Sequence, residues 1–292
     1  MNHLSCPVCA HPLRLKYKLK FNVYKCSHCG LFNSDAQFEY SFQSNLESDS
    51  RDTGLKNLRL KNFATIIQEL KHYCGEKADT IKGLEIGSGN GWWLQTCKEN
   101  KISCIGIEPE RIYENYHKEN ELDILYGFYP EINIKRDGGY DFIIFNDVFE
   151  HIEDINGLIE TLKKDLSDDG MLIINLPMST GFFYKVATLM HKFGFSSFLQ
   201  RLWQFNFHSP HMNYFNSKNM EFLLNKHDFL KINALNLDSL DFSSLKERIM
   251  SDKSMGKLKA LFLTTALVLM KPIILISKPD IKVFFFKKRF LI

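Results

Sequence analysis

The stretch Lys82-Gly83-Leu84-Glu85-Ile86-Gly87-Ser88-Gly89-Asn90-Gly91-Trp92 decides the fold of this chain. Leu84 and Ile86 form the apolar end of a predicted strand, and the glycines that follow at alternate positions allow a tight backbone turn beside a ligand. We expect a helix to begin near Asn90. The spacing is G-x-G-x-G, and Trp92 stands where a dinucleotide-binding loop requires its third glycine. The pattern therefore predicts a nucleotide-type binding turn that fits a pyrophosphate badly; a turn without a ligand is the alternative.

A second short apolar strand begins near Ile102 and ends on Glu108, seventeen positions after Gly91. A carboxylate at the tip of the neighbouring strand can accept two hydrogen bonds from a ribose diol. The alternative role is a helix N-cap, which Glu fills poorly compared with Asp or Ser. We therefore expect Glu108 to lie beside the glycine turn.

Strands and helices alternate regularly in the middle of the chain. We expect strands at residues 81–86, 103–108, 124–126, 141–145 and 171–176. This alternation predicts a parallel sheet covered by helices on both faces, with ligands at the carboxyl ends of the strands. Further along, the pattern predicts a helix at 218–226 and strands near 229–235 and 281–287, after an earlier helix at 55–73.

Four markers in this order resemble the class I S-adenosylmethionine-dependent methyltransferases, of the type 11/23-like group. The markers are residues 85–91, 106–109, 140–154 and 166–177. The resemblance covers residues 55–177 and implies a Rossmann-like, doubly wound, mostly parallel seven-stranded sheet. It also implies that the chain is an enzyme with S-adenosyl-L-methionine as its methyl donor.

The resemblance implies a set of residues that bind this cofactor. The glycines would admit its methionine end, Glu85 would order the loop and Glu108 would hold the ribose. Many family members carry an acid after the third strand that contacts the adenine amine, and residues 125–128 contain none. Phe128 or Tyr126 would then stack on the ring, or Asn146 would supply the polar contact. The full implied set is Glu85, Gly87, Ser88, Gly89, Gly91, Glu108, Pro109, Phe128, Asn146 and Asp147.

Three histidines are candidates for removing a proton from the methyl acceptor. In a large branch of the family, a histidine before an aromatic pair and a serine faces the active site, and His211 matches it, with His208 as the second choice. His151 follows Glu150 and lies near the acceptor pocket in some relatives; capping of the following helix is its alternative role. A neutral imidazole near pH 7 suits deprotonation of a hydroxyl.

Two C-x-x-C pairs stand near the start of the chain, at Cys6 and Cys9 and at Cys26 and Cys29. This spacing is typical of a four-cysteine zinc ribbon in which a β-hairpin brings the pairs together. Four thiolates close the coordination shell, so Zn²⁺ would be structural, and His28 would stay outside it. The lysines of the hairpin also allow nucleic-acid binding. The alternative is that they only form a solvated basic surface.

We divide the chain into a zinc ribbon (1–32), a linker or lid (33–54) and a methyltransferase domain (55–292). The last contains an aromatic cap at about 178–215 and a basic apolar segment at about 246–292. For the cap aromatics, lining the site and filling the core are both open.

Charge is distributed unevenly along the chain. Residues 171–219 contain no Asp or Glu, and from 246 to 292 eleven Lys or Arg stand against three acids. An aromatic, cationic cap joined to a basic apolar segment suits an anionic amphiphile as the acceptor. The expected acceptor is a hydroxyl of a nucleotide- or lipid-linked sugar in surface-glycan (polysaccharide) biosynthesis, which zinc-ribbon-bearing family members resemble. A quinone-like small metabolite is one alternative; a non-enzymatic nucleic-acid-binding protein is another, against which the glycine turn and Glu108 argue.

An apolar run at residues 260–270 is halted by Lys271-Pro272. It is shorter than the roughly twenty apolar residues that span a bilayer, so a buried helix and a membrane-interfacial helix are the alternatives. The seven cysteines, four of them in C-x-x-C pairs, and the absence of a secretory pattern predict a cytoplasmic protein with peripheral contact at the inner face of the membrane.

Overall fold

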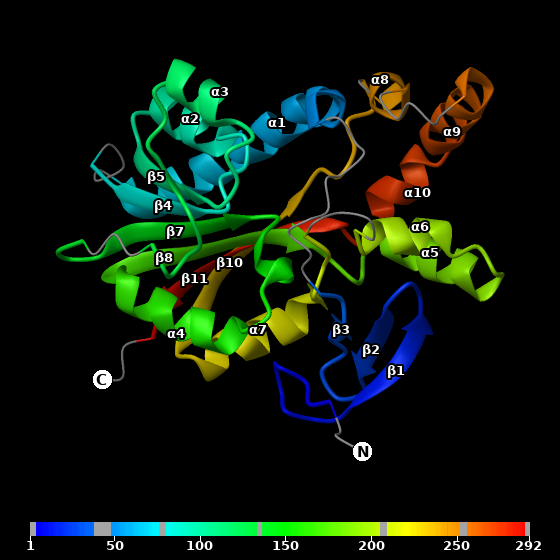
Figure 1. Ribbon diagram of the computed structural model, residues 1–292, viewed down its shortest axis with the longest axis horizontal. Helices are drawn as coiled ribbons and strands as arrows, with labels where there is room; N and C mark the ends of the chain where they lie inside the picture. Colours follow the sequence, from blue (N-terminus) through cyan, green and yellow to red (C-terminus); the bar gives the residue numbers. More distant parts are fainter. Residues whose placement is uncertain are drawn as a thin grey trace.

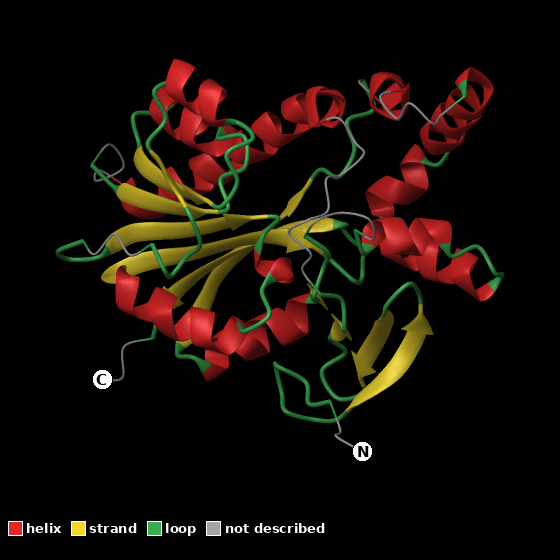
Figure 2. Cartoon of the chain, in the orientation of Figure 1, coloured by secondary structure: helices red, strands yellow, loops and turns green. Residues whose placement is uncertain are grey.

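The computed structural model describes residues 4–37, 48–75, 80–132, 136–204, 209–243, 245–250 and 256–289. Figure 1 shows a central sheet between two layers of helices, with a small second sheet and a group of helices at one end of it. Figure 2 shows the same layers by secondary structure.

The central sheet has seven strands in the order β10-β11-β8-β7-β4-β5-β6. Its strands are β4 (Lys82–Ile86), β5 (Ser103–Glu108), β6 (Ile124–Tyr126), β7 (Tyr140–Asn146), β8 (Leu166–Pro177), β10 (Phe229–Leu237) and β11 (Ile281–Lys288). Strands β4 to β8 pair in parallel, whereas β11 is antiparallel to both β8 and β10. The predicted Rossmann-like, mostly parallel sheet is confirmed, and the last strand lies inside it, between β8 and β10.

Strand β7 shows why this sequence forms a two-faced sheet. Its centre is uninterrupted apolar sequence, and Phe142, Ile143, Ile144 and Phe145 are all fully buried. Ile143 and Phe145 belong to the core on one face, whereas Phe142 and Ile144 belong to the core on the other. A strand buried on both faces requires apolar residues at every position, which is what a parallel sheet between helices demands.

The helices cover the two faces unequally. Helices α1 (Ser48–Cys74), α2 (Trp92–Glu99) and α3 (Glu114–Glu119) lie on one face, and α4 (Ile155–Asp165) and α7 (Ser217–Lys226) lie on the other (Figure 1). Helix α1 begins at Ser48, so part of the stretch that we expected to be a linker is helical. At its other end, Asn33 and Ser34 belong to a strand of the small sheet, so the predicted linker is wrong there too, and residues 38–47 lie outside the described residues.

The small sheet joins the start of the chain to its middle. Strands β1 (Leu13–Lys18), β2 (Asn22–Cys26) and β3 (Phe32–Ser34) pair in sequence order, and β3 then pairs with β9 (Asn213–Tyr214). We call residues 4–37 the cysteine hairpin. It also shares a hydrophobic cluster with the cap, in which its Tyr17 and Phe32 accompany Tyr184 and Trp203. The hairpin is therefore built into the rest of the fold.

Five short helices stand near the carboxyl ends of the parallel strands. They are α5 (Phe182–Lys192), α6 (Ser197–Leu202), α8 (Leu245–Met250), α9 (Lys257–Leu269) and α10 (Lys271–Ile276). The pairing of Ile281 with Pro177 puts the end of α10 and the start of α5 at the same end of the sheet. No helix in the described residues is long and apolar enough to cross a membrane.

Helix α9 is exposed. The buried helix that we gave as one alternative for residues 260–270 is therefore wrong. Leu258 is 85% exposed and Phe262 is 76% exposed, and Ala260 is the one residue of α9 that is buried. In the aromatic cap, Trp203 is fully buried and so fills the core, whereas Phe193 and Phe195 are exposed.

Candidate cofactor and acceptor site

The glycine turn has the left-handed backbone that its sequence requires. Gly87, Gly89 and Gly91 have φ of 76°, 52° and 80°, and α2 begins at Trp92, two positions later than expected. A Cβ added to Gly87 would lie 2.5 Å from a methyl group of Val148, but one added to Gly89 would meet no described atom within 4 Å. The turn is thus packed against the protein at Gly87 and open at Gly89, as a ligand cradle requires.

Glu108 lies beside this turn, as the strand order led us to expect. Its Oε2 accepts a hydrogen bond from the Gly89 amide at 2.7 Å, and its Oε1 accepts one from the Glu110 amide at 2.9 Å. The side chain is therefore held in one orientation at the carboxyl end of β5. Pro109 is exposed next to it, and Phe128 is 42% exposed after β6.

His117, which sequence reasoning missed, supports the same turn. Its Nε2 lies 3.0 Å from the Gly89 carbonyl oxygen and its Nδ1 lies 2.9 Å from the Tyr126 hydroxyl. A neutral imidazole satisfies both, by donating to the carbonyl and accepting from the hydroxyl. Burial lowers the pKa of His117 and so favours this neutral form. No local pattern marks His117, because α3 brings it to the turn only in the folded chain.

Glu85 is a buried carboxyl group at the end of β4. Its Oε1 accepts a hydrogen bond from Asn146 Nδ2 at 2.9 Å, and Asn175 Nδ2 in turn donates to Asn146 Oδ1 at 3.3 Å. Burial raises the pKa of Glu85 to about 8. Its second oxygen, Oε2, accepts no hydrogen bond from any described residue. The ammonium group of a ligand would satisfy this oxygen and stabilise the charged carboxylate.

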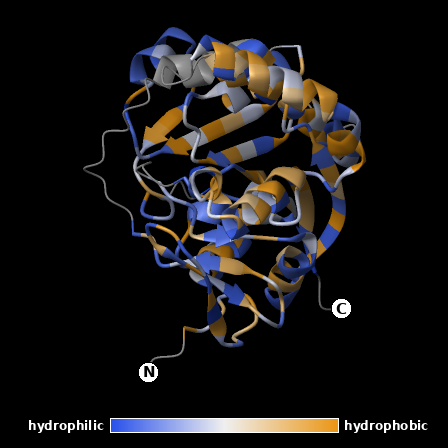
Figure 3. Ribbon diagram, turned by 90° about the vertical axis from the view of Figure 1, so that its right-hand side faces the viewer, coloured by the Kyte–Doolittle hydropathy of each residue, from blue (hydrophilic) through white to orange (hydrophobic). Residues whose placement is uncertain are grey.

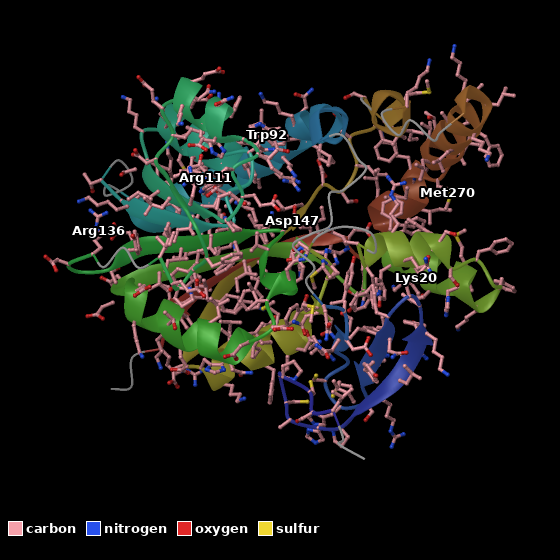
Figure 4. All side chains as sticks on the ribbon, in the orientation of Figure 1. Lys20, Trp92, Arg111, Arg136, Asp147 and Met270 are labelled. Atoms are coloured by element: carbon pink, nitrogen blue, oxygen red, sulfur yellow. The ribbon has the colours of Figure 1, made fainter. Side chains whose placement is uncertain are left out.

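Asp147 turns the chain away from the sheet. It has a φ of 55°, and its Oδ2 lies 3.1 Å from Arg59 Nη2 on α1. Figure 4 shows Asp147 at the end of β7, below Trp92 and Arg111 in this view. Arg59 had no signal in the sequence, because its role depends on how α1 packs.

Two of the three candidate histidines meet beyond Asp147. The short 3-10 helix η2 (Phe149–His151) carries His151, and His211 precedes β9; their ring centroids are 4.7 Å apart. His211 Nε2 lies 3.8 Å from Glu150 Oε1. All three side chains are buried, and burial, followed by the charge of Asp147, raises the pKa of Glu150. His208 lies outside the described residues.

The four predicted thiols come together in the cysteine hairpin. Their sulfur atoms all lie within 4.8 Å of one another, with 3.6 Å between Cys6 and Cys29 and 3.4 Å between Cys9 and Cys26. Sulfurs bound tetrahedrally to one zinc ion at about 2.3 Å would be about 3.8 Å apart. His28 stacks on His11 with ring centroids 3.9 Å apart.

A family model described as a methyltransferase domain matches residues 58–233. A curated relative from Staphylococcus carnosus, an "Uncharacterized methyltransferase", is 30% identical over 118 residues, which are 39% of this chain and 53% of the relative. The chain therefore spans about half the length of the curated relative it matches.

Solved structures share the fold. A putative sarcosine dimethylglycine methyltransferase from Galdieria sulphuraria has a TM-score of 0.52 and 16% identity, over 85% of this chain and 94% of that one. A SAM-dependent methyltransferase from Thermotoga maritima, described as a possible histamine N-methyltransferase, has a TM-score of 0.52 and 15% identity, over 82% and 96%. At these identities the likeness concerns the fold. The fold of this chain is that of S-adenosylmethionine-dependent methyltransferases. The family model covers more than half of the chain, and the sheet and the glycine turn agree with it. The chain therefore belongs to the methyltransferase domain family.

Proposed function

We propose that this protein transfers a methyl group from S-adenosylmethionine to a hydroxyl group of an anionic amphiphile, with a nucleotide- or lipid-linked sugar of surface-glycan biosynthesis as the leading candidate. The observation that carries this proposal is an exposed, apolar and basic surface at the carboxyl end of the sheet. It is formed by α9, α10 and the α5–α6 turn, and we call it the apolar ledge.

The residues of the cradle fit this cofactor. The second oxygen of Glu85 would accept a hydrogen bond from the ammonium group at the methionine end, and the open side of Gly89 leaves room for the ligand. Glu108 would bind the ribose diol, and the half-exposed ring of Phe128 would stack on adenine. Ser88 and Pro109 would flank the cofactor. When bound, S-adenosylmethionine supplies a methyl group on a sulfonium, which is already an excellent leaving group.

The remaining task of the chain is to position the acceptor and remove its proton. Positioning supplies several kcal/mol, and a group that takes up the proton adds a factor of about 100 to 10,000. We assign activation of the hydroxyl to His211, with His151 beside it on η2. Asn146 would hold the Glu85 carboxyl group in place by its hydrogen bond to Oε1. Asp147 would lie beside the adenosine of the cofactor.

The apolar ledge favours an amphiphilic acceptor. Its most exposed side chains are each at least 66% exposed: Leu258, Phe262, Leu269, Leu275, Ile276, Phe193 and Phe195. Exposed lysines stand among them, at Lys192, Lys257, Lys259, Lys271 and Lys278. Figure 3 shows hydrophobic colours along the helices at the top of the view. Exposed apolar side chains with cations among them suit an anionic lipid or lipid-linked substrate.

We also propose that the four cysteines hold one structural Zn²⁺. The sulfur separations suit a tetrahedral ion, and a closed shell of four thiolates has no position for substrate. The ion would stabilise the cysteine hairpin and take no part in methyl transfer.

Two measurements test the proposed function. Calorimetric titration with S-adenosylhomocysteine and, separately, with NAD should give micromolar binding of the first alone; no binding of S-adenosylhomocysteine would contradict the proposal.

Transfer of labelled methyl groups is then compared for lipid-linked sugars in anionic vesicles, nucleotide sugars and phenolic quinone precursors. Label on a sugar supports the leading candidate, and label on the phenol alone would establish the quinone-like alternative. Steeply salt-dependent RNA binding without cofactor binding would favour the nucleic-acid alternative.

A further inference from the structure

A second cluster of metal-ligating side chains lies apart from the four cysteines. Glu150, His151 and His211 each offer one ligand atom, and these atoms all lie within 4.8 Å of one another. The three residues are 0%, 8% and 3% exposed. We propose that this cluster binds one divalent transition-metal ion.

The carboxylate of Glu150 supplies the first argument. It is fully buried, and neither of its oxygens accepts a hydrogen bond from any described residue. The nearby cation Arg59 is directed to Asp147 instead. A buried carboxylate that lacks hydrogen bonds is strongly destabilising unless an opposite charge accompanies it. A divalent ion bound to the carboxylate would supply that charge.

His151 has the tautomer of a metal ligand. Its Nδ1 lies 2.9 Å from the Pro210 carbonyl oxygen, which can only accept, so Nδ1 carries the proton. The Ser209 hydroxyl lies 3.1 Å from the same nitrogen. The lone pair of the ring is therefore on Nε2. Metal-binding histidines are typically held in this way, with the second nitrogen donating to a carbonyl or carboxylate.

His211 closes the cluster at a separation that an ion can bridge. The 3.8 Å between its Nε2 and Glu150 Oε1 is too long for a hydrogen bond. An ion about 2.1 Å from each atom would fit between them. The two segments are also held in register, because the Met212 amide donates to the Glu150 carbonyl oxygen at 3.0 Å. The site is thus organised before the ion arrives.

The donor set defines the class of ion. Two imidazoles and one carboxylate suit a first-row transition ion or zinc better than magnesium or calcium, and three protein ligands leave positions for water or a substrate oxygen. If the proposed function is right, the acceptor hydroxyl would take such a position and the ion would lower its pKa. In that case the proton of the hydroxyl would pass to solvent water, and His211 would act as a ligand of the ion and not as a base. The binding of the ion itself does not depend on the proposed function.

The test uses Mn²⁺, which thiolate sites bind poorly and whose free form is measured by electron paramagnetic resonance. The full chain, with the metal of its cysteine cluster retained and checked by elemental analysis, is titrated with MnCl₂. The variants are Glu150→Gln, His211→Gln and, as a matched control, His227→Gln, which removes a buried histidine whose Nδ1 lies 2.6 Å from Glu160 Oε1. The wild type and the control should bind one equivalent, and the two cluster variants should bind at least about tenfold more weakly.

A second readout separates loss of the site from loss of the fold. Mn²⁺ should raise the melting temperature of the wild type and the control but not of Glu150→Gln. Without Mn²⁺ that variant should melt no lower than the wild type, since it replaces a buried carboxyl group that accepts no hydrogen bond from any described residue. No Mn²⁺ binding by the wild type, or equal binding by all four proteins, would overturn the inference. Titration of the same samples with S-adenosylhomocysteine reports on the proposed function separately.

Discussion

Ser34 Oγ in the cysteine hairpin donates a hydrogen bond to the main-chain oxygen of His211 at 2.8 Å, across 177 positions of sequence. The Ser34 amide also donates to the Met212 carbonyl oxygen at 2.9 Å. The cysteine hairpin therefore holds the segment that carries His211. Neither hydrogen bond involves the glycine turn. This arrangement predicts that the hairpin affects acceptor chemistry more than cofactor binding.

Loss of the Zn²⁺ that we propose for the cysteine hairpin should separate acceptor chemistry from cofactor binding. In Cys26→Ser, we expect the transfer rate to fall up to about 100-fold, because small displacements of a reacting group have effects of that size. The dissociation constant for S-adenosylhomocysteine should change less than threefold, roughly within a kcal/mol. Rates and calorimetry on the same samples check this, with Cys104→Ser, outside the hairpin, as the control. Equal losses in both properties would show that the variant unfolds as a whole.

Cofactor affinity should be sensitive to a methyl group at Gly89, because we expect the cofactor to bind beside this residue. Gly89→Ala places a side chain at a left-handed φ, which costs about 1–2 kcal/mol of stability. Gly138→Ala is a matched control, because Gly138 has a φ of 83° and its added Cβ also meets no described atom within 4 Å. Both variants should lose similar stability in urea unfolding, but only Gly89→Ala should lose cofactor affinity. Comparable affinities would mean that the ligand lies elsewhere.

Glu108→Gln removes a charge that orders the turn and that we expect to bind ribose. The loss of charge-assisted hydrogen bonds should weaken S-adenosylhomocysteine binding by about 1.5–3 kcal/mol. Glu119→Gln, an exposed change of the same kind on α3, should leave it unaltered. Calorimetry on the three proteins checks the difference, and an unchanged affinity in Glu108→Gln would rule out its ribose role.

The raised pKa of Glu85 should make the free energy of unfolding fall as pH rises. Its folded-state pKa of about 8 lies above its ordinary value of 4.5, so between these values the folded state holds a proton that the unfolded state has released. The folded state therefore loses stability through this window, by about 1.4 kcal/mol per pH unit at most. The wild type should lose about 2–3 kcal/mol more than Glu85→Gln between pH 6 and pH 8. Urea unfolding of both at the two pH values measures the difference, and parallel pH profiles would contradict it.

The apolar ledge should bind anionic vesicles. Phe262→Glu combined with Leu269→Glu replaces two exposed side chains, 76% and 75% exposed, with charges that an anionic surface repels. We expect at least about tenfold weaker co-sedimentation with anionic vesicles, because each large apolar side chain contributes about 1.5–3 kcal/mol when buried. Leu230→Glu, at 48% exposure on β10, is the control. Cofactor affinity should stay constant in all three, and equal sedimentation would exclude the ledge as a membrane contact.

The sequence by itself determined the parts of this protein that depend on local pattern. Strand β5 (Ser103–Glu108) and strand β6 (Ile124–Tyr126) have the bounds expected from their apolar runs. The glycine turn follows from spacing, because few residues other than glycine adopt its backbone. The meeting of Glu108 with that turn follows from strand order in a parallel sheet. The four cysteines likewise come together as their spacing predicts.

Only the tertiary structure decided the contacts between distant segments. His117 at the Gly89 carbonyl, Arg59 at Asp147 and Glu150 at His211 have no periodicity or spacing that would mark them. The exposure of α9 was equally undetermined, because an uninterrupted apolar run has the same composition whether it enters a core or stands at the surface. Local sequence limits which backbone conformations a segment can adopt, but side-chain pairing and burial depend on what the rest of the chain packs against that segment.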